Sequence, residues 1–159
     1  MKILQLPPNK NEIINLLIEW TEFIVEEKYQ QAIDMFLIDE FENYNAKTLE
    51  QSVYAYGVVG YTKEEALKKY GCLNKATSIL KSPHKDYIIN NSIRIDIYDE
   101  YTIKEWGISD FLEKNKIIGF IDYDDFLLDG KMSDLTARFY IKKLNEKEYT
   151  LIFQDLHVL

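Results

Sequence analysis

The chain has 159 residues, a length that suits one domain with its own hydrophobic core, so we expect residues 1–159 to fold as a single domain. Its 19 Lys and Arg residues against 27 Asp and Glu residues give a net charge of -8. That balance disfavours nucleic acid and anionic membrane surfaces as partners, because both attract cationic chains, and it permits a cationic protein partner.

Cysteine content and hydropathy indicate the compartment. Cys72 is the only cysteine, so no disulfide can form within the chain, and a reducing compartment fits. We expect Cys72 to be a small buried side chain rather than a nucleophile. The apolar run before Pro7 is too short for a signal peptide, and no later segment has the uncharged length that spans a bilayer. The sequence therefore predicts a cytoplasmic protein.

The first elements along the chain are two helices. Asn9 followed by Glu12 resembles a capping box for a helix over residues 11–27, and a shorter helix is predicted over residues 29–37. The longer helix has an apolar stripe at helical spacing, and such a stripe needs a sheet to cover it. The stripe consists of Ile13, Leu16, Leu17, Trp20, Phe23 and Ile24.

The middle of the chain carries shorter patterns. A third helix is predicted over residues 48–56. Thr62 and Glu65 form a clear capping box for a helix over residues 63–70, which Gly71 ends. Residues 71–91 show the least regular pattern. The elements expected next are a strand over residues 92–99, where apolar and polar side chains alternate, a second strand over 101–108, and a helical turn or loop over 109–115.

Three strands are predicted at the C-terminal end, over residues 116–126, 133–144 and 148–159. All three are rich in β-branched and aromatic residues, so an antiparallel meander is the natural arrangement. Turn residues separate the strands, namely Asp129-Gly130 and residues 145–147.

Alternating side chains divide each of the last two strands into two faces. In the middle strand one face holds Leu135, Ala137, Phe139 and Ile141, and the other holds Thr136, Arg138, Tyr140 and Lys142. In the last strand one face holds Ile152, Leu156 and Val158, and the other holds Leu151, Phe153, Asp155 and His157. A loop with an even number of residues matches the apolar faces and places Arg138 opposite or diagonal to Asp155, with His157 beside Asp134 or Thr136. A three-residue loop would separate Arg138 from Asp155.

Helices followed by antiparallel strands are typical of the α+β class. The order predicts N-terminal helices packed on a curved antiparallel sheet, and it resembles the NTF2-like or cystatin-like cone. The segments WTEF at residues 20–23 and EKYQQAIDMF at 27–36 resemble the opening of many NTF2-like proteins. SDLTARF at 133–139 and DLHVL at 155–159 resemble the tail of a group of small uncharacterised bacterial proteins of that fold. The superfamily includes isomerases, dehydratases, small-molecule binders and interaction modules, so the resemblance implies a fold and leaves the function open.

The mixed face of the last two strands offers the candidate binding site, which consists of Asp134, Arg138, Tyr140, Asp155 and His157. A carboxylate or an imidazole held in an apolar pocket can serve as a general acid or base. The alternative is structural, with Arg138 neutralising Asp155 as an ion pair and His157 at the rim of the sheet.

Other polar residues receive structural interpretations. Acidic residues crowd the segment before the hairpin, but Phe126 and Leu127 stand where an EF-hand needs a ligand and a glycine. We therefore expect no metal and no cofactor. His84 is expected to be an exposed loop residue, and residues 57–60 lack the pattern of a phosphate-binding loop. The acidic cluster, interpreted as a solvated strand end, consists of Asp122, Asp124, Asp125 and Asp129.

Three functions are compatible with this sequence. The first in rank is a non-enzymatic binding or interaction protein, for example an immunity-type protein whose acidic surface blocks a basic toxin. The second is a small-molecule pocket enzyme of the isomerase or dehydratase type, with Asp155 or His157 as the general base. The third is a homodimeric scaffold whose exposed sheet face pairs with itself. The expected partner is a second copy or another protein, a small hydrophobic ligand is the alternative, and neither nucleic acid nor a membrane is expected.

Overall fold

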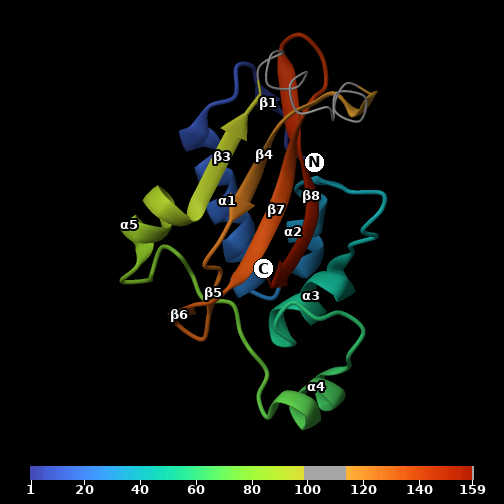
Figure 1. The fold of residues 1–159 in the computed structure, drawn as a ribbon, viewed down its shortest axis with the longest axis vertical. Helices are drawn as coiled ribbons and strands as arrows, with labels where there is room; N and C mark the ends of the chain where they lie inside the picture. Colours follow the sequence, from blue (N-terminus) through green and yellow to red (C-terminus); the bar gives the residue numbers. More distant parts are fainter. Residues whose placement is uncertain (99–113, 159) are drawn as a thin grey trace.

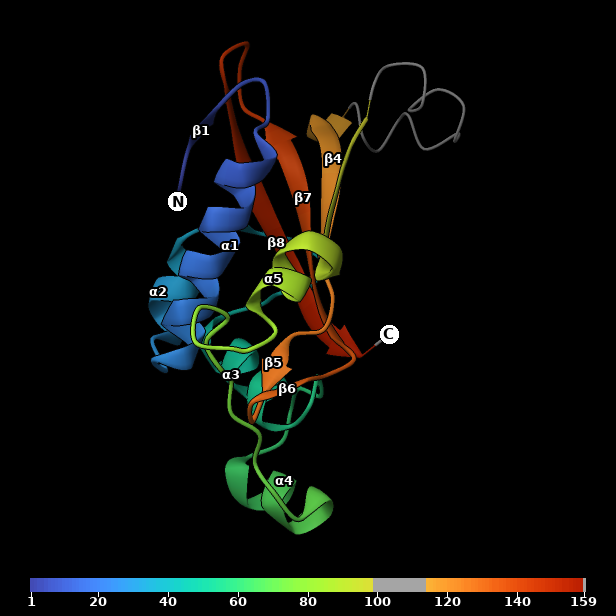
Figure 2. The same cartoon turned by 90° about the vertical axis from the view of Figure 1, so that its left-hand side faces the viewer.

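The computed structural model describes residues 1–98 and 114–158. Helices lie on one side of a strongly curled antiparallel sheet, which confirms the α+β class (Figure 1, Figure 2). The helices are α1 (Lys10–Val25), α2 (Tyr29–Asp34), α3 (Ala46–Tyr54), α4 (Lys63–Tyr70) and α5 (Lys85–Tyr87), followed by a π-helical turn (Ile88–Ser92). The strands are β1 (Leu4–Gln5), β2 (Leu37–Ile38), β3 (Ile93–Ile97), β4 (Ile117–Tyr123), β5 (Leu127–Leu128), β6 (Lys131–Met132), β7 (Leu135–Lys143) and β8 (Glu148–Val158).

The strands of the main sheet run in the order β1-β8-β7-β4-β3, each antiparallel to the next. β2 lies parallel to β8 on the same edge as β1. The predicted C-terminal meander is confirmed, because β4, β7 and β8 are neighbours in this order. A small hairpin of β5 and β6 is inserted between β4 and β7. Its turn is Asp129-Gly130, both with positive φ (49° and 78°), as a type I′ hairpin turn requires.

α1 packs on the sheet through Trp20. The Asn9 side chain accepts a hydrogen bond from the Glu12 N–H at 3.1 Å and caps the helix start. Trp20 is fully buried, with its ring centroid 5.3 Å from that of Phe139 and 5.4 Å from that of Phe153. The predicted stripe is confirmed apart from Phe23, which is only partly buried. The buried residues of α1 are Ile13, Leu16, Leu17, Trp20, Thr21 and Ile24.

The boundaries of α2 and α3 differ from the prediction. α2 ends at Asp34, before the predicted end at residue 37, because Leu37 and Ile38 extend along the edge of β8 as β2. This pairing gives partners to backbone groups that an edge strand would otherwise leave open. α3 begins two residues earlier than predicted, because Asn45 caps the helix at Ala46.

α4 has the predicted limits, with the Thr62–Glu65 capping box at its start and Gly71 in the left-handed conformation (φ 79°) at its end. The helix projects away from the body of the molecule (Figure 1, Figure 2). Cys72 follows it and is exposed, so the expectation of a buried thiol was wrong. The buried cluster next to α4 is too small to cover it: Tyr54, Ala55 and Ala66.

β3 falls within the strand predicted over residues 92–99, and His84 is exposed as expected. The strand predicted over residues 101–108 lies outside the described residues. So does the turn predicted over 109–115, apart from Lys114 and Asn115, which are helical.

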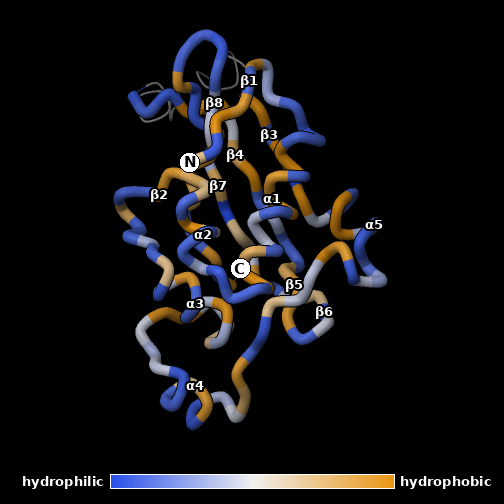
Figure 3. Tube along the Cα trace, turned by 180° about the vertical axis from the view of Figure 1, so that it is seen from behind, coloured by the Kyte–Doolittle hydropathy of each residue, from blue (hydrophilic) through white to orange (hydrophobic). Residues whose placement is uncertain are grey.

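The core lies between α1 and the inner face of the sheet. Hydrophobic and hydrophilic residues are interleaved along the strands, so the opposite face is mixed (Figure 3). The predicted apolar face of the middle strand is confirmed. The inner-face residues of β7 and β8 are Leu135, Ala137, Phe139, Ile141, Tyr149, Leu151, Phe153 and Leu156.

Candidate functional site

The sheet face opposite α1 carries no described helix (Figure 2), and we call it the open face. Side chains that are direct cross-strand partners lie on the same face of a sheet, so the ladder registers define its members. They are Arg94 and Asp96 of β3, Phe120 and Asp122 of β4, Thr136, Arg138 and Tyr140 of β7, and Ile152, Asp155 and His157 of β8.

Four charged residues cross the open face in one row, which we call the charge row. Arg94 pairs with Asp122, Asp122 with Arg138, and Arg138 with Asp155, so the sign of the charge alternates over four neighbouring strands. The predicted pairing of Arg138 with Asp155 is confirmed. Opposite charges at direct cross-strand positions are a stabilising arrangement.

The ion pairs of the charge row are formed side chain to side chain. Arg138 donates from Nε to Asp155 Oδ1 at 3.0 Å and from a terminal nitrogen to Oδ2 at 2.8 Å, which is a bidentate pair. Hydrogen bonding to this carboxylate raises the pKa of the Arg138 guanidinium above its ordinary value. Arg94 donates from one terminal nitrogen to Asp122 Oδ2, and its Nε lies 3.3 Å from Asp96 Oδ2. The charges therefore satisfy one another, and the outer end of each Arg is open to solvent, with side chains 58% (Arg94) and 40% (Arg138) exposed.

A β-bulge brings Asp155 to the open face, rather than the even loop that we expected. The Leu144 N–H donates to the Glu148 carbonyl at 2.9 Å, so the turn between them has three residues. That turn alone would put Arg138 and Asp155 on opposite faces. Gln154 has no ladder partner, because the register passes from Phe139–Phe153 to Arg138–Asp155, and this extra residue returns Asp155 to the side of Arg138. The predicted faces of the last strand were wrong for the same reason.

His157 lies beside Asp155 on β8, one cross-strand pair from the charge row. Its Nδ1 lies 3.1 Å from Asp155 Oδ1, and it pairs across the ladder with Thr136, one of the two predicted neighbours. Tyr140 lies one pair further along β7, and burial raises its pKa. Together with Arg138, these residues occupy the same part of the open face.

Asp134 is the member of the predicted site that lies apart. It is exposed, just before β7 begins, and its carboxylate accepts a hydrogen bond from the Tyr56 hydroxyl. It therefore belongs to the junction with the helical side and not to the charge row.

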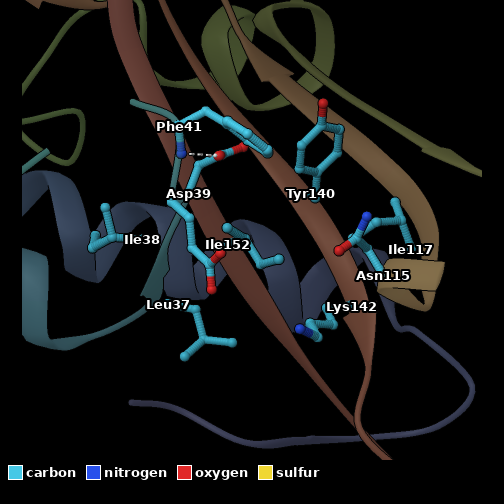
Figure 4. A pocket seen from close by; sticks show the side chains of 10 residues that line it. Leu37, Ile38, Asp39, Phe41, Asn115, Ile117, Tyr140, Lys142 and Ile152 are labelled. Carbon is cyan, nitrogen blue, oxygen red and sulfur yellow. Dashed lines mark hydrogen bonds between the residues drawn. The ribbon is translucent and has the colours of Figure 1, made fainter. Parts of the chain in front are cut away.

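A pocket of about 220 Å³ lies beside Tyr140 and Ile152 of the open face. Figure 4 shows the side chains that line it. Drug-sized ligands generally occupy pockets of roughly 300 to 1,000 Å³, so this one suits a single side chain or a small molecule. Ile152 forms its floor, and Lys142 and Asp39 supply charges at its rim. Asp155, His157 and Arg138 do not line it.

One wall of the pocket is the acidic loop, our name for residues 39–42. The Asp39 N–H donates to the Phe153 carbonyl at 3.0 Å, which anchors the loop to β8. The Phe41 N–H donates to Asp39 Oδ1 at 2.9 Å and turns the chain. Phe41 itself is 83% exposed, with three carboxylates within two residues along the chain.

The acidic residues considered as metal ligands have separate partners. Asp124 accepts a bond from Thr136 at 2.7 Å, Asp125 accepts one from Ser92 at 2.6 Å, and Asp122 pairs with Arg94. Over residues 1–98 and 114–158, no group of three or more His, Cys, Asp or Glu side chains is arranged to hold a metal ion.

Sequence reasoning missed Arg94, Asp122 and the acidic loop. Alternation in residues 92–99 does put Arg94 on the polar face, but the order of strands across the sheet was needed to place it beside Asp122. Phe41 was missed because an aromatic residue is usually a sign of burial.

Comparisons with protein-family models, with curated proteins and with solved structures found no match. Within the described part of the chain, no helix has both the length and the apolar character needed to cross a membrane.

Proposed function

We propose that this protein is a non-enzymatic binding protein that holds a basic protein partner with its acidic loop and open face, in the manner of an immunity-type protein. Phe41 is the observation behind the proposal. Phe41 is 83% exposed beside Asp39, Glu40 and Glu42, at the edge of the open face. Aromatic residues that enter a partner's pocket supply much of the energy of protein interfaces, and surrounding charges select the partner.

The charges of the loop support a basic partner. Residues 39–42 contribute three carboxylates and no cation, within a chain of net charge -8. Such a surface attracts a cationic protein over distances of about a Debye length, roughly 8 to 10 Å at physiological salt. Next to it, the charge row presents alternating signs, which favours one docking register over others.

Two features of the open face support binding over catalysis. Arg138 bonds both carboxylate oxygens of Asp155, so this carboxylate is poorly placed to accept a proton from a substrate. The pocket beside Tyr140 has neither Asp155 nor His157 in its wall. The inner face offers no better place for a substrate near these residues, since Trp20 packs there against Phe139 and Phe153.

The proposal includes an NTF2-like fold and a cytoplasmic location. Helices packed on one side of a curled antiparallel sheet support the fold, together with the segments at residues 20–36 and 133–139. The exposed thiol of Cys72 supports the location, because a free exposed cysteine is stable chiefly in a reducing compartment.

Affinity capture with the purified chain tests the proposal. The wild-type protein is expected to retain a basic protein from a lysate of its host cells, and salt should weaken the retention. Phe41→Ala should reduce the recovery of that protein at least about tenfold, because hot-spot aromatics contribute 2 kcal/mol or more. Quantitative mass spectrometry of the eluates gives the comparison.

Leu67→Ala is the matched control for this capture. Leu67 is 50% exposed on α4, so its truncation also removes an exposed apolar side chain, but away from the acidic loop. The control should recover the partner as the wild type does. Equal recovery with Phe41→Ala, or no protein recovered in preference by the wild type, would contradict the proposed function.

A further inference from the structure

The outer edge of β3 is a second surface suited to binding. β3 is the outermost strand on its side of the sheet (Figure 1), and among residues 1–98 and 114–158 it pairs only with β4. An edge strand presents N–H and C=O groups that can pair with another chain. This surface is separate from the acidic loop, which lies at the opposite, β8 edge.

The bonds to β4 determine which groups of β3 point outward. The Tyr98 N–H donates to a carbonyl of β4, and the Ser92 carbonyl accepts from the residue after β4, both at 2.8 Å. Bonded and non-bonded pairs alternate along an antiparallel ladder, so Arg94 and Asp96 also bond to β4. The residues that direct both backbone groups away from β4 are therefore Ile93, Ile95 and Ile97.

We propose that β3 pairs in an antiparallel manner with β3 of a second copy, about a two-fold axis at Ile95. The strand reads IRIDI, which is complementary to itself in this register. Arg94 lies opposite the partner's Asp96, and Asp96 lies opposite the partner's Arg94. The three isoleucines of each copy exchange backbone bonds across the axis.

In this register both ion pairs fall on non-bonded cross-strand pairs, which are more closely spaced than the hydrogen-bonded pairs. Arg94 and Asp96 occupy non-bonded pairs on the outer edge, where opposing Cα atoms are about 4.5 Å apart and side chains contact most closely. Both side chains are accessible, at 58% and 47% exposed. In the monomer the Arg94 Nε lies 3.3 Å from Asp96 Oδ2 of the same strand. In the dimer Arg94 can contact Asp122 on one side and the partner's Asp96 on the other.

Pairing at β3 joins the two sheets into one. The two open faces become continuous, because the even-numbered residues of both β3 strands point to the same side. Ile97 is 43% exposed, and in the dimer it lies beside the partner's Ile93. Ile93 is the first residue of β3 and follows α5 and the π-helical turn. This dimer does not rest on the proposed function. It shares Arg94 and Asp96 with the open face, but it uses the backbone edge of β3 and no residue of the acidic loop.

Sedimentation equilibrium of the wild-type chain is the first test. At about 100 μM, a concentration that populates complexes with micromolar dissociation constants, the mass should be twice the 18.9 kDa of one chain. A mass of 18.9 kDa at that concentration would overturn the proposal.

Charge exchange tests the register. Asp96→Arg and Arg94→Asp each place like charges opposite each other, so each variant alone should dissociate at least about tenfold more readily than the wild type. Mixed together, the two variants are complementary and should form a heterodimer. Glu64→Arg carries the same charge change as Asp96→Arg on an exposed residue of α4 and should dimerise like the wild type. Single variants that dimerise normally, or a mixture that stays monomeric, would overturn the register.

Ile97→Pro provides a test that leaves both charged residues in place. Proline removes the outward N–H of residue 97 and no bond to β4, a position that edge strands tolerate. Its dimer should be at least about tenfold weaker, with circular dichroism showing a folded chain. If Arg94→Asp is unstable beside Asp122, Ile97→Pro and Asp96→Arg decide the matter, and unchanged dimers of both would refute the proposal.

Discussion

Asp155 shows how single residues form the candidate site. It is only 8% exposed, yet it stays in the sheet because Arg138 bonds both of its oxygens. A buried carboxylate costs free energy unless it is paired. The main effect of Arg138 is to offset that cost, and the net stability that the ion pair adds is small. The solvent-exposed part of Arg138 remains available for a partner.

Arg138→Ala should lower the free energy of unfolding by about 1 to 3 kcal/mol, because it leaves the Asp155 carboxylate without its main partner. The value should fall below the roughly 3 to 5 kcal/mol of fully buried pairs, since water reaches the Arg138 side chain. The double change Arg138→Gln with Asp155→Asn keeps a polar pair without charge and should cost less than Arg138→Ala. Urea denaturation of the wild type and the two variants measures both losses, and a larger loss in the double variant would contradict this expectation.

At the scale of elements, β7 and β8 show what the sequence could predict. Alternation located both strands, and matching of their faces predicted the Arg138–Asp155 pair. The bulge at Gln154 was not predictable, because no residue type in FQDL marks an unpaired position. Two departures from the expected geometry, the odd turn and the extra residue, cancel each other, so the predicted pair forms although the predicted loop does not.

The same limit applies to the rest of the fold. Local signals were strong for α4, where a capping box and a glycine mark both ends, and its predicted limits are confirmed. β2 and the charge row depend on which strands become neighbours, and local patterns do not contain that information. Cys72 was misplaced because burial depends on how much core surrounds a residue, and not on its own polarity.

Deleting Gln154 should leave the fold and the ion pair intact. The deletion removes the unpaired residue and gives a regular ladder, in which Asp155 still lies opposite Arg138. We expect a loss of unfolding free energy below about 1.5 kcal/mol, within the usual range of single changes. Deleting Ile152 is the control, because it would turn Phe153 outward and Gln154 into the core. Equal losses in the two deletion variants, measured by urea denaturation, would contradict the bulge assignment.

Trp20→Ala tests the packing of α1 on the sheet. Trp20 is fully buried against Phe139 and Phe153, so the change should cost about 3 to 5 kcal/mol, as for other core aromatics. Phe23→Ala should cost distinctly less, because Phe23 is only partly buried. Denaturant titration of both variants gives the comparison, and a Trp20 loss within experimental error would mean that α1 does not pack there.

For the whole molecule, several tyrosines are buried or partly buried, and their ionisation links stability to pH. Burial raises the pKa of Tyr29 to about 12 and that of Tyr98 to about 12, and it raises the pKa of Tyr123 well above its ordinary value. In the unfolded chain a tyrosine loses its proton near pH 10, roughly its unperturbed pKa. Between that pH and the folded-state value, the folded chain binds more protons than the unfolded chain.

Stability should therefore be insensitive to these tyrosines below about pH 10 and should fall as the pH rises from about 10 to 12. Urea denaturation at neutral pH and at several alkaline values measures the loss. Tyr123→Phe should make the fall shallower, since the phenylalanine ring keeps the packing and has no proton to lose. A free energy of unfolding that stays constant to pH 12 would contradict the assigned burial.

Hydroxyl-radical footprinting, with and without the captured partner, tests most directly whether the open face and the acidic loop form the binding surface. It reports the exposure of individual side chains, so it distinguishes this face from the rest of the molecule. We predict that the partner lowers the oxidation of Phe41 and Tyr140 and leaves that of Leu67 on α4 unchanged. If Phe41 and Tyr140 are oxidised equally with and without the partner, the binding surface lies elsewhere.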